Sequence, residues 1–408
     1  MGRVSNWMLA GLVASGVMGC RKAEPTTEPA PTGATEEAKT AAPVESKEIK
    51  LGQVMPYSGP ASAYGTIGKL HTAFFNKINK EGGINGRKIT LISLDDSYSP
   101  PKAVEQVRKL VEQDHVVAIF NPVGTPSNSA VQKYLNEKKV AQLFVATGAS
   151  KWNDPKNYPY TIGFNPSYHV EGVTYAQDIL KNNPKAKIAV LYQNDDFGKD
   201  IFEGLKEGLG DKAKQIVAEA SYEVTDPTVD SQLVTLKGSK ADTFVNIATP
   251  KFAAQAIRKV ADLKWKATQY LVNVSASVST VLTPAGLDKS KGAITIAYIK
   301  DPNNKEYDND PALNEWRAFM KSEYPDGKIT DGTNVYAYLT AKTLVDVIKN
   351  AGDDVSAEGL MKSAASLKDY TSGLLMPGVK INTGADDFEL FDQLNLVKFD
   401  GTTWVAKD

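Results

Sequence analysis

A loop near residue 124 carries the residue types that could bind a small anion. The apolar run 116–120 is typical of a strand buried on both faces. Residues 121–124 break this run, and we expect a helix to start with Thr125 as its N-cap and Pro126 at its first position. Such a loop directs free backbone N–H groups and the positive end of a helix dipole at one point. The Thr125 hydroxyl would lie beside them, so the chemistry suits a carboxylate, although an ordinary helix cap would show the same pattern.

The known signatures of catalysis, metal binding and cofactor binding are missing from the sequence. The three histidines are far apart and lack the spacing of metal ligands. No G-x-S-x-G elbow occurs, residues 65–69 form only an incomplete phosphate-binding loop, and no G-x-G-x-x-G follows the first strand. The sequence therefore gives no indication of an enzyme, and we expect no metal and no cofactor.

Strands and helices alternate along the rest of the chain, which predicts parallel sheets joined by right-handed crossovers. In the first half we expect strands at 49–55, 88–94, 116–120 and 140–146. A second unit begins near 168 with a helix, and we expect its strands at 187–193, 215–222, 243–248 and 269–273. Further helix is expected between 311 and 367. Since 408 residues are too many for one ordinary core, we expect two α/β domains.

The first 20 residues have the pattern of a targeting segment. Arg3 gives a thin positive region, and the apolar run 7–17 is too short to span a bilayer as a helix. The run from Val17 to Cys20 resembles a lipobox, at which a signal peptide is removed and the cysteine is acylated. We therefore expect residues 1–20 to be a lipoprotein signal peptide and Cys20 to carry the lipid. A plain secretory signal that happens to contain a cysteine is the alternative.

The segment 21–48 is rich in Pro, Glu, Thr and Ala and nearly lacks large apolar residues. It cannot bury enough surface to fold, so we expect a disordered tether with a reach of roughly 30 Å. The 47 basic and 48 acidic residues nearly balance, which gives no indication of a nucleic-acid partner. We expect a monomer in the periplasm or at the cell surface, held to the membrane through Cys20.

Three motifs resemble the opening of one family. They are S-G-P-A-S-A-Y-G at 58–65, E-G-G-I-N-G-R at 81–87, and the pair Asp95-Asp96. Together they are similar to type I periplasmic binding proteins, in the leucine/isoleucine/valine-binding branch that serves ABC importers. The resemblance implies an α/β fold of two Rossmann-like lobes joined by a three-crossover hinge. It places lobe 1 at 49–167 plus 298–387, lobe 2 at 168–297 plus 388–408, and the ligand at the carboxyl ends of the strands.

The resemblance also implies which residues contact the ligand. Gly124 and Thr125 match positions that bind a ligand carboxylate through backbone N–H and hydroxyl groups. Gly148 and Ser150 match positions that supply a carbonyl and a hydroxyl. Tyr64 and Phe197 match aromatic wall positions, one in each lobe. Tyr168 matches a position at the first hinge crossover, Thr249 the tip of a lobe 2 loop, and Asp331 a position at the entry to a helix.

One position departs from the family pattern. Where the family places a glutamate against the ammonium of an α-amino acid, this chain has Val274. Asp331 is the nearest alternative acid, unless the register slips and Asp226 or Glu171 serves instead. We therefore expect either an aromatic or aliphatic carboxylate, or an amino acid whose ammonium meets a different acid.

These observations predict an extracytoplasmic solute-binding lipoprotein of an ABC importer, with a permease and an ATPase as partners. Hinge bending would trap a small carboxylate between the lobes without making or breaking a bond. A ligand-sensing subunit of the same fold that signals to a receptor is an alternative. A lipid-anchored hydrolase is a third, which the missing pair of nucleophile and base disfavours.

Overall fold

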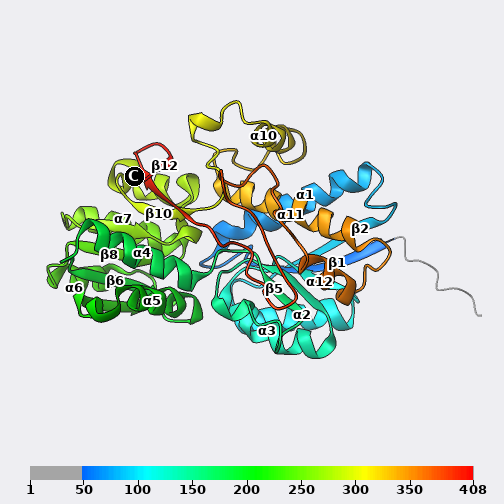
Figure 1. The fold of residues 1–408 in the computed structure, drawn as a ribbon, viewed down its shortest axis with the longest axis horizontal. Coiled ribbons are helices and arrows are strands. Elements are labelled where there is room, and N and C mark those ends of the chain that lie inside the picture. Colours follow the sequence, from blue (N-terminus) through cyan, green and yellow to red (C-terminus); the bar gives the residue numbers. More distant parts are fainter. Residues whose placement is uncertain (1–47, 408) are drawn as a thin grey trace, which may run out of the picture. The chain divides into compact units, whose positions relative to one another are not determined.

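The computed structural model describes residues 48–407 (Figure 1). The expected signal peptide, the acylated Cys20 and nearly all of the tether lie outside the described residues. Strand β1 (Glu48–Met55) starts one residue before the position expected for the first strand. Among the helices of residues 48–407, none is long and apolar enough to cross a bilayer.

The first lobe is built on a five-stranded parallel sheet in the order β2-β1-β3-β4-β5. Its strands after β1 are β2 (Lys88–Asp95), β3 (Ala118–Phe120), β4 (Ala141–Val145) and β5 (Thr161–Gly163). The helices between them are α1 (Gly65–Lys80), α2 (Pro100–Glu112) and α3 (Thr125–Lys138). This order is the Rossmann-like arrangement that the alternating pattern predicts.

The second lobe is built on a seven-stranded sheet in the order β12-β11-β10-β9-β8-β6-β7. The five strands β6 to β10 run parallel, whereas β11 and β12 are antiparallel to their neighbours. The strands are β6 (Ile188–Gln193), β7 (Ile216–Tyr222), β8 (Thr243–Ile247), β9 (Thr268–Leu271), β10 (Ile294–Ala297), β11 (Asn395–Phe399) and β12 (Trp404–Ala406). The helices are α4 (Tyr168–Asn182), α5 (Asp196–Leu209), α6 (Asp230–Gly238), α7 (Pro250–Asp262) and the short α8 (Thr283–Ala285) and α9 (Leu287–Ser290).

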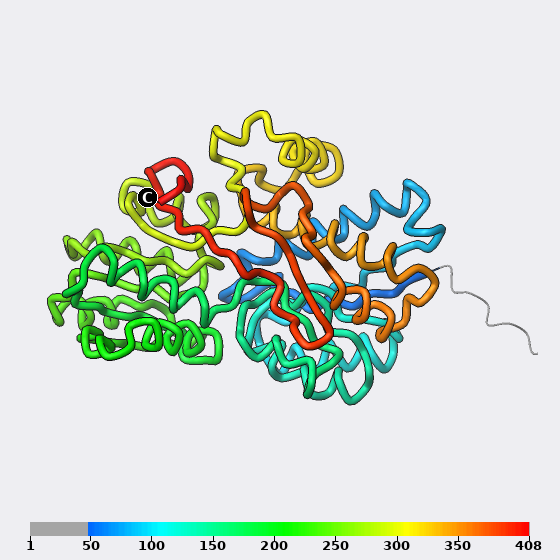
Figure 2. Tube along the Cα trace, viewed as in Figure 1, coloured from blue at the N-terminus to red at the C-terminus, as the bar shows by residue number. Residues whose placement is uncertain are grey.

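The chain passes between the lobes three times. The first crossing joins β5 to α4, and the second follows β10, because Tyr298 already packs in the core of the first lobe. The third lies between Phe391, which packs in that same core, and Leu396, which packs in the second lobe. Figure 2 shows this last segment, in red, running from the first lobe to the second. The packing of Phe391 favours a final crossing a few residues after the expected boundary at 387, and the residue-level boundaries stay a prediction.

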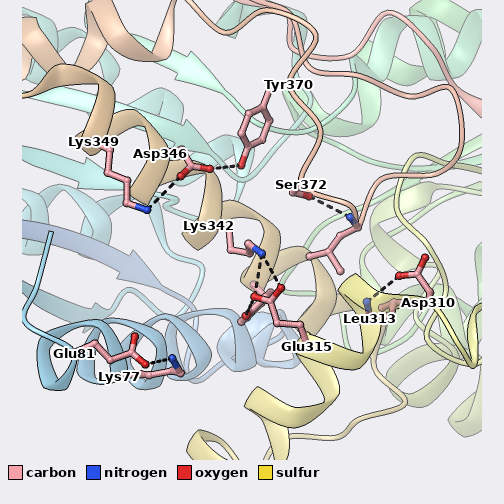
Figure 3. Close-up of polar contacts among 12 residues, drawn as sticks. Lys77, Glu81, Asp310, Leu313, Glu315, Lys342, Asp346, Lys349, Tyr370 and Ser372 are labelled. Atoms are coloured by element: carbon pink, nitrogen blue, oxygen red, sulfur yellow. Dashed lines mark hydrogen bonds and ion pairs between the residues drawn. The ribbon is translucent and has the colours of Figure 1, made fainter.

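Three helices that follow the second crossing complete the first lobe: α10 (Pro311–Glu323), α11 (Gly332–Ala351) and α12 (Ala357–Ala364). α11 is buried along most of its length, so it is the central helix of this layer. Figure 3 shows the polar contacts that fasten it at its surface. Lys342 contacts Glu315 of α10 at 3.0 Å, and the Tyr370 hydroxyl donates to Asp346 at 3.0 Å. These contacts fix the middle and the C-terminal half of α11 within the first lobe, whereas its N-terminal residues Gly332 and Thr333 line the site described next.

Candidate ligand-binding site

A cavity of about 170 Å³ lies between the two lobes, at the carboxyl ends of strands from both sheets. Side chains from both lobes line it, and most of the lining is apolar or aromatic. Six of the nine residues expected to contact the ligand line it, namely Tyr64, Gly124, Thr125, Tyr168, Phe197 and Thr249. The sequence therefore identified cavity residues that are as distant from each other in the chain as Tyr64 and Thr249.

The N-terminus of α3 forms one wall of the cavity. Gly124 is the N-cap of α3 and Thr125 is its first residue, so the cap lies one residue earlier than the sequence indicated. The amide N–H groups of this first turn have no acceptor within the helix. The buried Thr125 hydroxyl hydrogen-bonds that of Thr147. Backbone donors, the helix dipole and a hydroxyl thus converge on the cavity wall, where they suit a carboxylate.

Tyr98 packs on this wall and was not identified from the sequence. Its ring lies so close to Gly124 that a Cβ at that position would come within 2.5 Å of Tyr98 Cε2. Gly124 also has a φ of 99°, which a residue with a side chain rarely adopts. Both observations explain why glycine occupies position 124. The pair Asp95-Asp96 was the available signal, because the Asp96 carboxylate accepts from the Tyr98 N–H at 2.9 Å and fixes this turn.

The lobes are closed on each other across the cavity. Tyr64 of the first lobe donates its hydroxyl proton to the Val274 carbonyl of the second at 2.9 Å. Ser277 of the second lobe likewise donates to Asp331 at 2.9 Å. These two hydrogen bonds join the lobes near the cavity, so the structure represents the closed conformation of a two-lobed molecule.

Gly148 and Ser150 lie outside the cavity lining. The Gly148 carbonyl accepts from the Tyr168 N–H at 2.7 Å, and it helps to fix the first crossing. Ser150 directs both its N–H and its hydroxyl at the Asp200 carboxylate of α5, each at 2.8 Å. Both residues line a second, much smaller hollow of about 20 Å³. The structure thus places Ser150 in a contact between the lobes, at some remove from Thr125.

Asp331 also lies outside the lining, although Gly332 and Thr333 next to it are part of it. Its carboxylate caps α11 by accepting from the Thr333 N–H at 3.0 Å, and it accepts from Ser277 as well. Burial raises the pKa of Asp331, while these hydrogen bonds lower it. The arrangement makes Asp331 a helix cap at the edge of the site.

The position of the missing glutamate is at the cavity. Val274 lies in a short 3₁₀ turn, Asn273–Ser275, and it lines the cavity without offering an acid. Of the two other acids considered, Asp226 closes a turn by accepting from the Glu223 N–H at 2.9 Å. Glu171 is buried behind the wall and accepts from the Asn273 N–H at 2.7 Å.

The second lobe contributes an aromatic ring and a hydroxyl. Phe197, in the first turn of α5, makes an edge contact with Tyr168 at 5.2 Å between ring centroids. The Thr249 hydroxyl donates to Gln193 at 3.1 Å, and Tyr222 donates to the same Gln193 oxygen at 3.0 Å. This wall is therefore rigid and its hydrogen-bonding groups are engaged with one another, which leaves mainly ring faces for the ligand.

Several further lining residues were not identified from the sequence because they enter from the hinge and the last strands. Trp404 lines the cavity and donates its indole N–H to the Ala276 carbonyl at 2.8 Å. Lys300 is the lone lysine or arginine among the described lining residues, and Asp310 holds its Nζ at 2.5 Å. A ligand carboxylate would compete with that aspartate, so the α3 terminus is the better anion site. Residues 48–407 contain no cluster of metal-ligating side chains.

Comparison with known proteins identifies the family. A family model described as periplasmic binding protein matches residues 48–403, which is most of the chain. The chain belongs to the periplasmic binding protein family. Among its relatives, Leu/Ile/Val-binding protein homolog 7 of Brucella suis is 23% identical over 340 residues, which cover 80% of this chain and 83% of that protein.

Solved structures of periplasmic binding proteins share the fold. A branched-chain amino acid ABC transporter protein from Thermus thermophilus with bound valine matches with a TM-score of 0.79 and 15% identity, covering 90% of this chain and 96% of that one. A fatty acid ABC transporter substrate-binding protein from Thermomonospora curvata matches with a TM-score of 0.72 and 23% identity, covering 88% and 91%. These likenesses confirm the two-lobed type I fold.

The family confirms the broader expectations. A periplasmic binding protein of the Leu/Ile/Val-binding type binds a small molecule outside the cytoplasm and is not an enzyme. The roles of individual residues, the ligand and the lipid anchor stay predictions.

Proposed function

We propose that this protein is a lipid-anchored receptor that captures a small carboxylate for an ABC importer of the branched-chain amino acid type. The observation that carries the proposal is the closed cavity with the N-terminus of α3 in its wall. Thr125 and the first amides of α3 would bind the carboxylate, and the Tyr64 and Phe197 rings would enclose the apolar body. A permease and an ATPase would receive the closed, loaded protein, and Cys20 would anchor it.

The size of the cavity argues for a compact ligand. A dry cavity of about 150 Å³ in another protein accommodates benzene. The cavity of about 170 Å³ here is only slightly larger, so it suits a branched or single-ring body. A relative in structure binds valine and another is a fatty acid protein, according to their descriptions. The volume favours the first kind of ligand, because a long acyl chain would need the lobes to stay apart.

The proposal can be tested by identifying the ligand directly. Native mass spectrometry of the protein purified from its own host would weigh whatever the closed lobes retain. A thermal-shift and calorimetric series would then compare leucine, its deaminated analogue 4-methylpentanoate, benzoate and dodecanoate. We expect at least one of the first three to bind and dodecanoate to bind more weakly. Retention of a neutral molecule, with no binding by any carboxylate, would overturn the proposal.

A further inference from the structure

The hairpin of β11 and β12 at the end of the chain forms one side of the cavity. Val397 of β11 and Trp404 of β12 line it, together with Ala276 and Val278. Trp404 is 7% exposed, and its ring contacts Phe399, its partner across the hairpin, at 5.4 Å between centroids. The last strand of the chain therefore brings a large aromatic residue to the cavity wall.

Asp301 fastens this tryptophan from the other lobe. It comes shortly after Tyr298, which lines the cavity and packs in the core of the first lobe, so it follows the second crossing. Its Oδ2 accepts from the Trp404 N–H at 3.0 Å and from the Thr403 hydroxyl at 2.6 Å. The Trp404 carbonyl accepts from the Asn304 side chain at 3.4 Å. The segment after the second crossing thus binds both polar groups of the Trp404 backbone.

Asp301 is the lone carboxylic acid among the described lining residues, yet its oxygens are occupied. Its Oδ1 accepts from the backbone N–H of Asn303 at 3.0 Å and from the Asn303 side chain at 2.8 Å. With the two bonds to Oδ2, four donors meet a carboxylate that offers about four acceptor sites. Asp301 is therefore built to hold the hairpin and has no acceptor site left for a ligand.

The indole is held at its other end as well. Its Nε1–H donates to the carbonyl of Ala276, which follows the short turn that carries Val274. The side chain thus reaches from β12 to a second lining segment of the same lobe. A ligand too wide for the cavity could displace the indole only by breaking these hydrogen bonds, which are costly to lose in a buried place.

We propose that Trp404 sets the width of the ligand body that the closed lobes accept, and that Asp301 is the residue that positions it. The inference rests on the proposed function and deepens it, because it assigns the size limit of the cavity to one side chain. A branched or single-ring carboxylate would pack on the indole, whereas a fused two-ring body would collide with it.

The first experiment compares 4-methylpentanoate, benzoate and 2-naphthoate by calorimetry. We expect the parent to bind at least one of the first two, and 2-naphthoate about tenfold or more weakly. Trp404→Ala should bind the small acids about three- to tenfold more weakly and 2-naphthoate more tightly, so that the order reverses. Trp404→Leu keeps an apolar side chain for the hairpin and should shift the preference in the same direction.

Trp265→Leu is a matched control for these variants. Trp265 is buried in the core of the second lobe and donates its indole N–H to the Ala241 carbonyl at 2.7 Å, as Trp404 does to Ala276. It is absent from the cavity lining. Its substitution should lower stability and leave the order of the three acids unchanged, which separates the width of the site from a general loosening of the lobe.

The second experiment tests the positioning role of Asp301 through the fluorescence of Trp404. The spectrum of Trp404→Leu, subtracted from that of the parent, isolates this emission. Asp301→Ala should shift it to the red and reduce the discrimination against 2-naphthoate, whereas Asp301→Asn keeps an acceptor oxygen and should retain most of both. In a Trp404→Leu background, Asp301→Ala should have little further effect on the preference, because the two residues act through one contact.

The outcomes distinguish this inference from the proposed function. The same order of the three acids in the parent and Trp404→Leu, or equal weakening of all three, would overturn the width-setting role. Unchanged Trp404 emission in Asp301→Ala would overturn the positioning role. A native ligand with a two-ring body would overturn the inference and leave the proposed function standing. Failure of every carboxylate to bind the parent would overturn both.

Discussion

Thr125 is the single side chain on which the carboxylate model depends most. It is 1% exposed, it begins α3, and it lines the cavity beside the first amides of that helix. Thr125→Val keeps the shape and removes the hydroxyl. Since a hydrogen bond to a charged group contributes about 1.5–3 kcal/mol, we expect ten- to a hundredfold weaker binding by calorimetry. Thr268→Val, at an exposed strand position, should change nothing, and equal affinities of parent and Thr125→Val would remove this contact from the model.

Glu171 should also make stability depend on pH in the absence of ligand. Its folded-state pKa of about 7 exceeds its ordinary value, so the folded protein holds this proton over a range in which the unfolded chain has lost it. Stability from this source is present below about pH 4.5 and is lost as the pH rises through about 7. Urea unfolding at pH 5 and pH 8 should show the parent losing up to about 3 kcal/mol relative to Glu171→Gln. A difference that is the same at both pH values would contradict the buried acid.

Among individual residues, the sequence predicted ligand contacts where a motif or the chemistry of a loop indicates them, such as Gly124, Thr125 and Tyr64. It did not find Tyr98, Tyr298 or Trp404. Their roles arise from packing between segments far apart in the chain, for instance the contact of Trp404 with Ala276. No local pattern records such a contact.

The ends of helices are the elements that build the cavity wall, and α11 shows what one cap contributes. Asp331 accepts from the Thr333 N–H at 3.0 Å and from Ser277 of the other lobe. Asp331→Ala should lower the free energy of unfolding by about 1 kcal/mol in urea titrations. Asp331→Asn keeps an acceptor for the cap and should leave ligand affinity within about threefold. A hundredfold loss of affinity in Asp331→Asn would instead restore Asp331 as a direct ligand contact.

The elements that the sequence predicted best are long and strongly patterned. The helix expected to begin near 168 is α4 (Tyr168–Asn182), and the first two strands lie within a residue or so of their expected places. The three-residue strands β5 and β12 are too short to show a period. β11 pairs with β10, although residues 298–394 separate the two strands in the chain. Only the tertiary fold determines that pairing.

The anchor concerns the whole molecule, because it decides where the closed protein meets its permease. Cys20 follows a short apolar run, and a segment without large apolar residues follows it. Cys20→Ser should move the protein from the membrane fraction to the soluble extracytoplasmic fraction, as immunoblots of fractionated cells would show. Ligand affinity should not change, since the site lies in residues 48–407. The same partition for parent and variant would refute acylation.

Closure of the two lobes retains the ligand in the cavity. Ser150, which lies outside the cavity, stabilises the closed conformation through contacts with the second lobe. Both of its donors meet the Asp200 carboxylate, and Lys151 contacts Asp196 of the same helix at 3.2 Å. These bonds can form only when the lobes are closed, so they should slow opening and have little effect on ligand entry.

Asp200→Asn removes the negative charge of the acceptor, so the Ser150 N–H and hydroxyl lose their charge-assisted hydrogen bonds. Because the pair is partly exposed, we expect ligand dissociation to become about three- to tenfold faster, with the association rate changed by less than about twofold. Stopped-flow fluorescence of Trp404, which lines the cavity, would follow both rates. Asp211→Asn, at an exposed position, is the matched control. An unchanged dissociation rate would show that Ser150 and Asp200 do not hold the lobes together, and an equal change in both rates would place their effect in the ligand site.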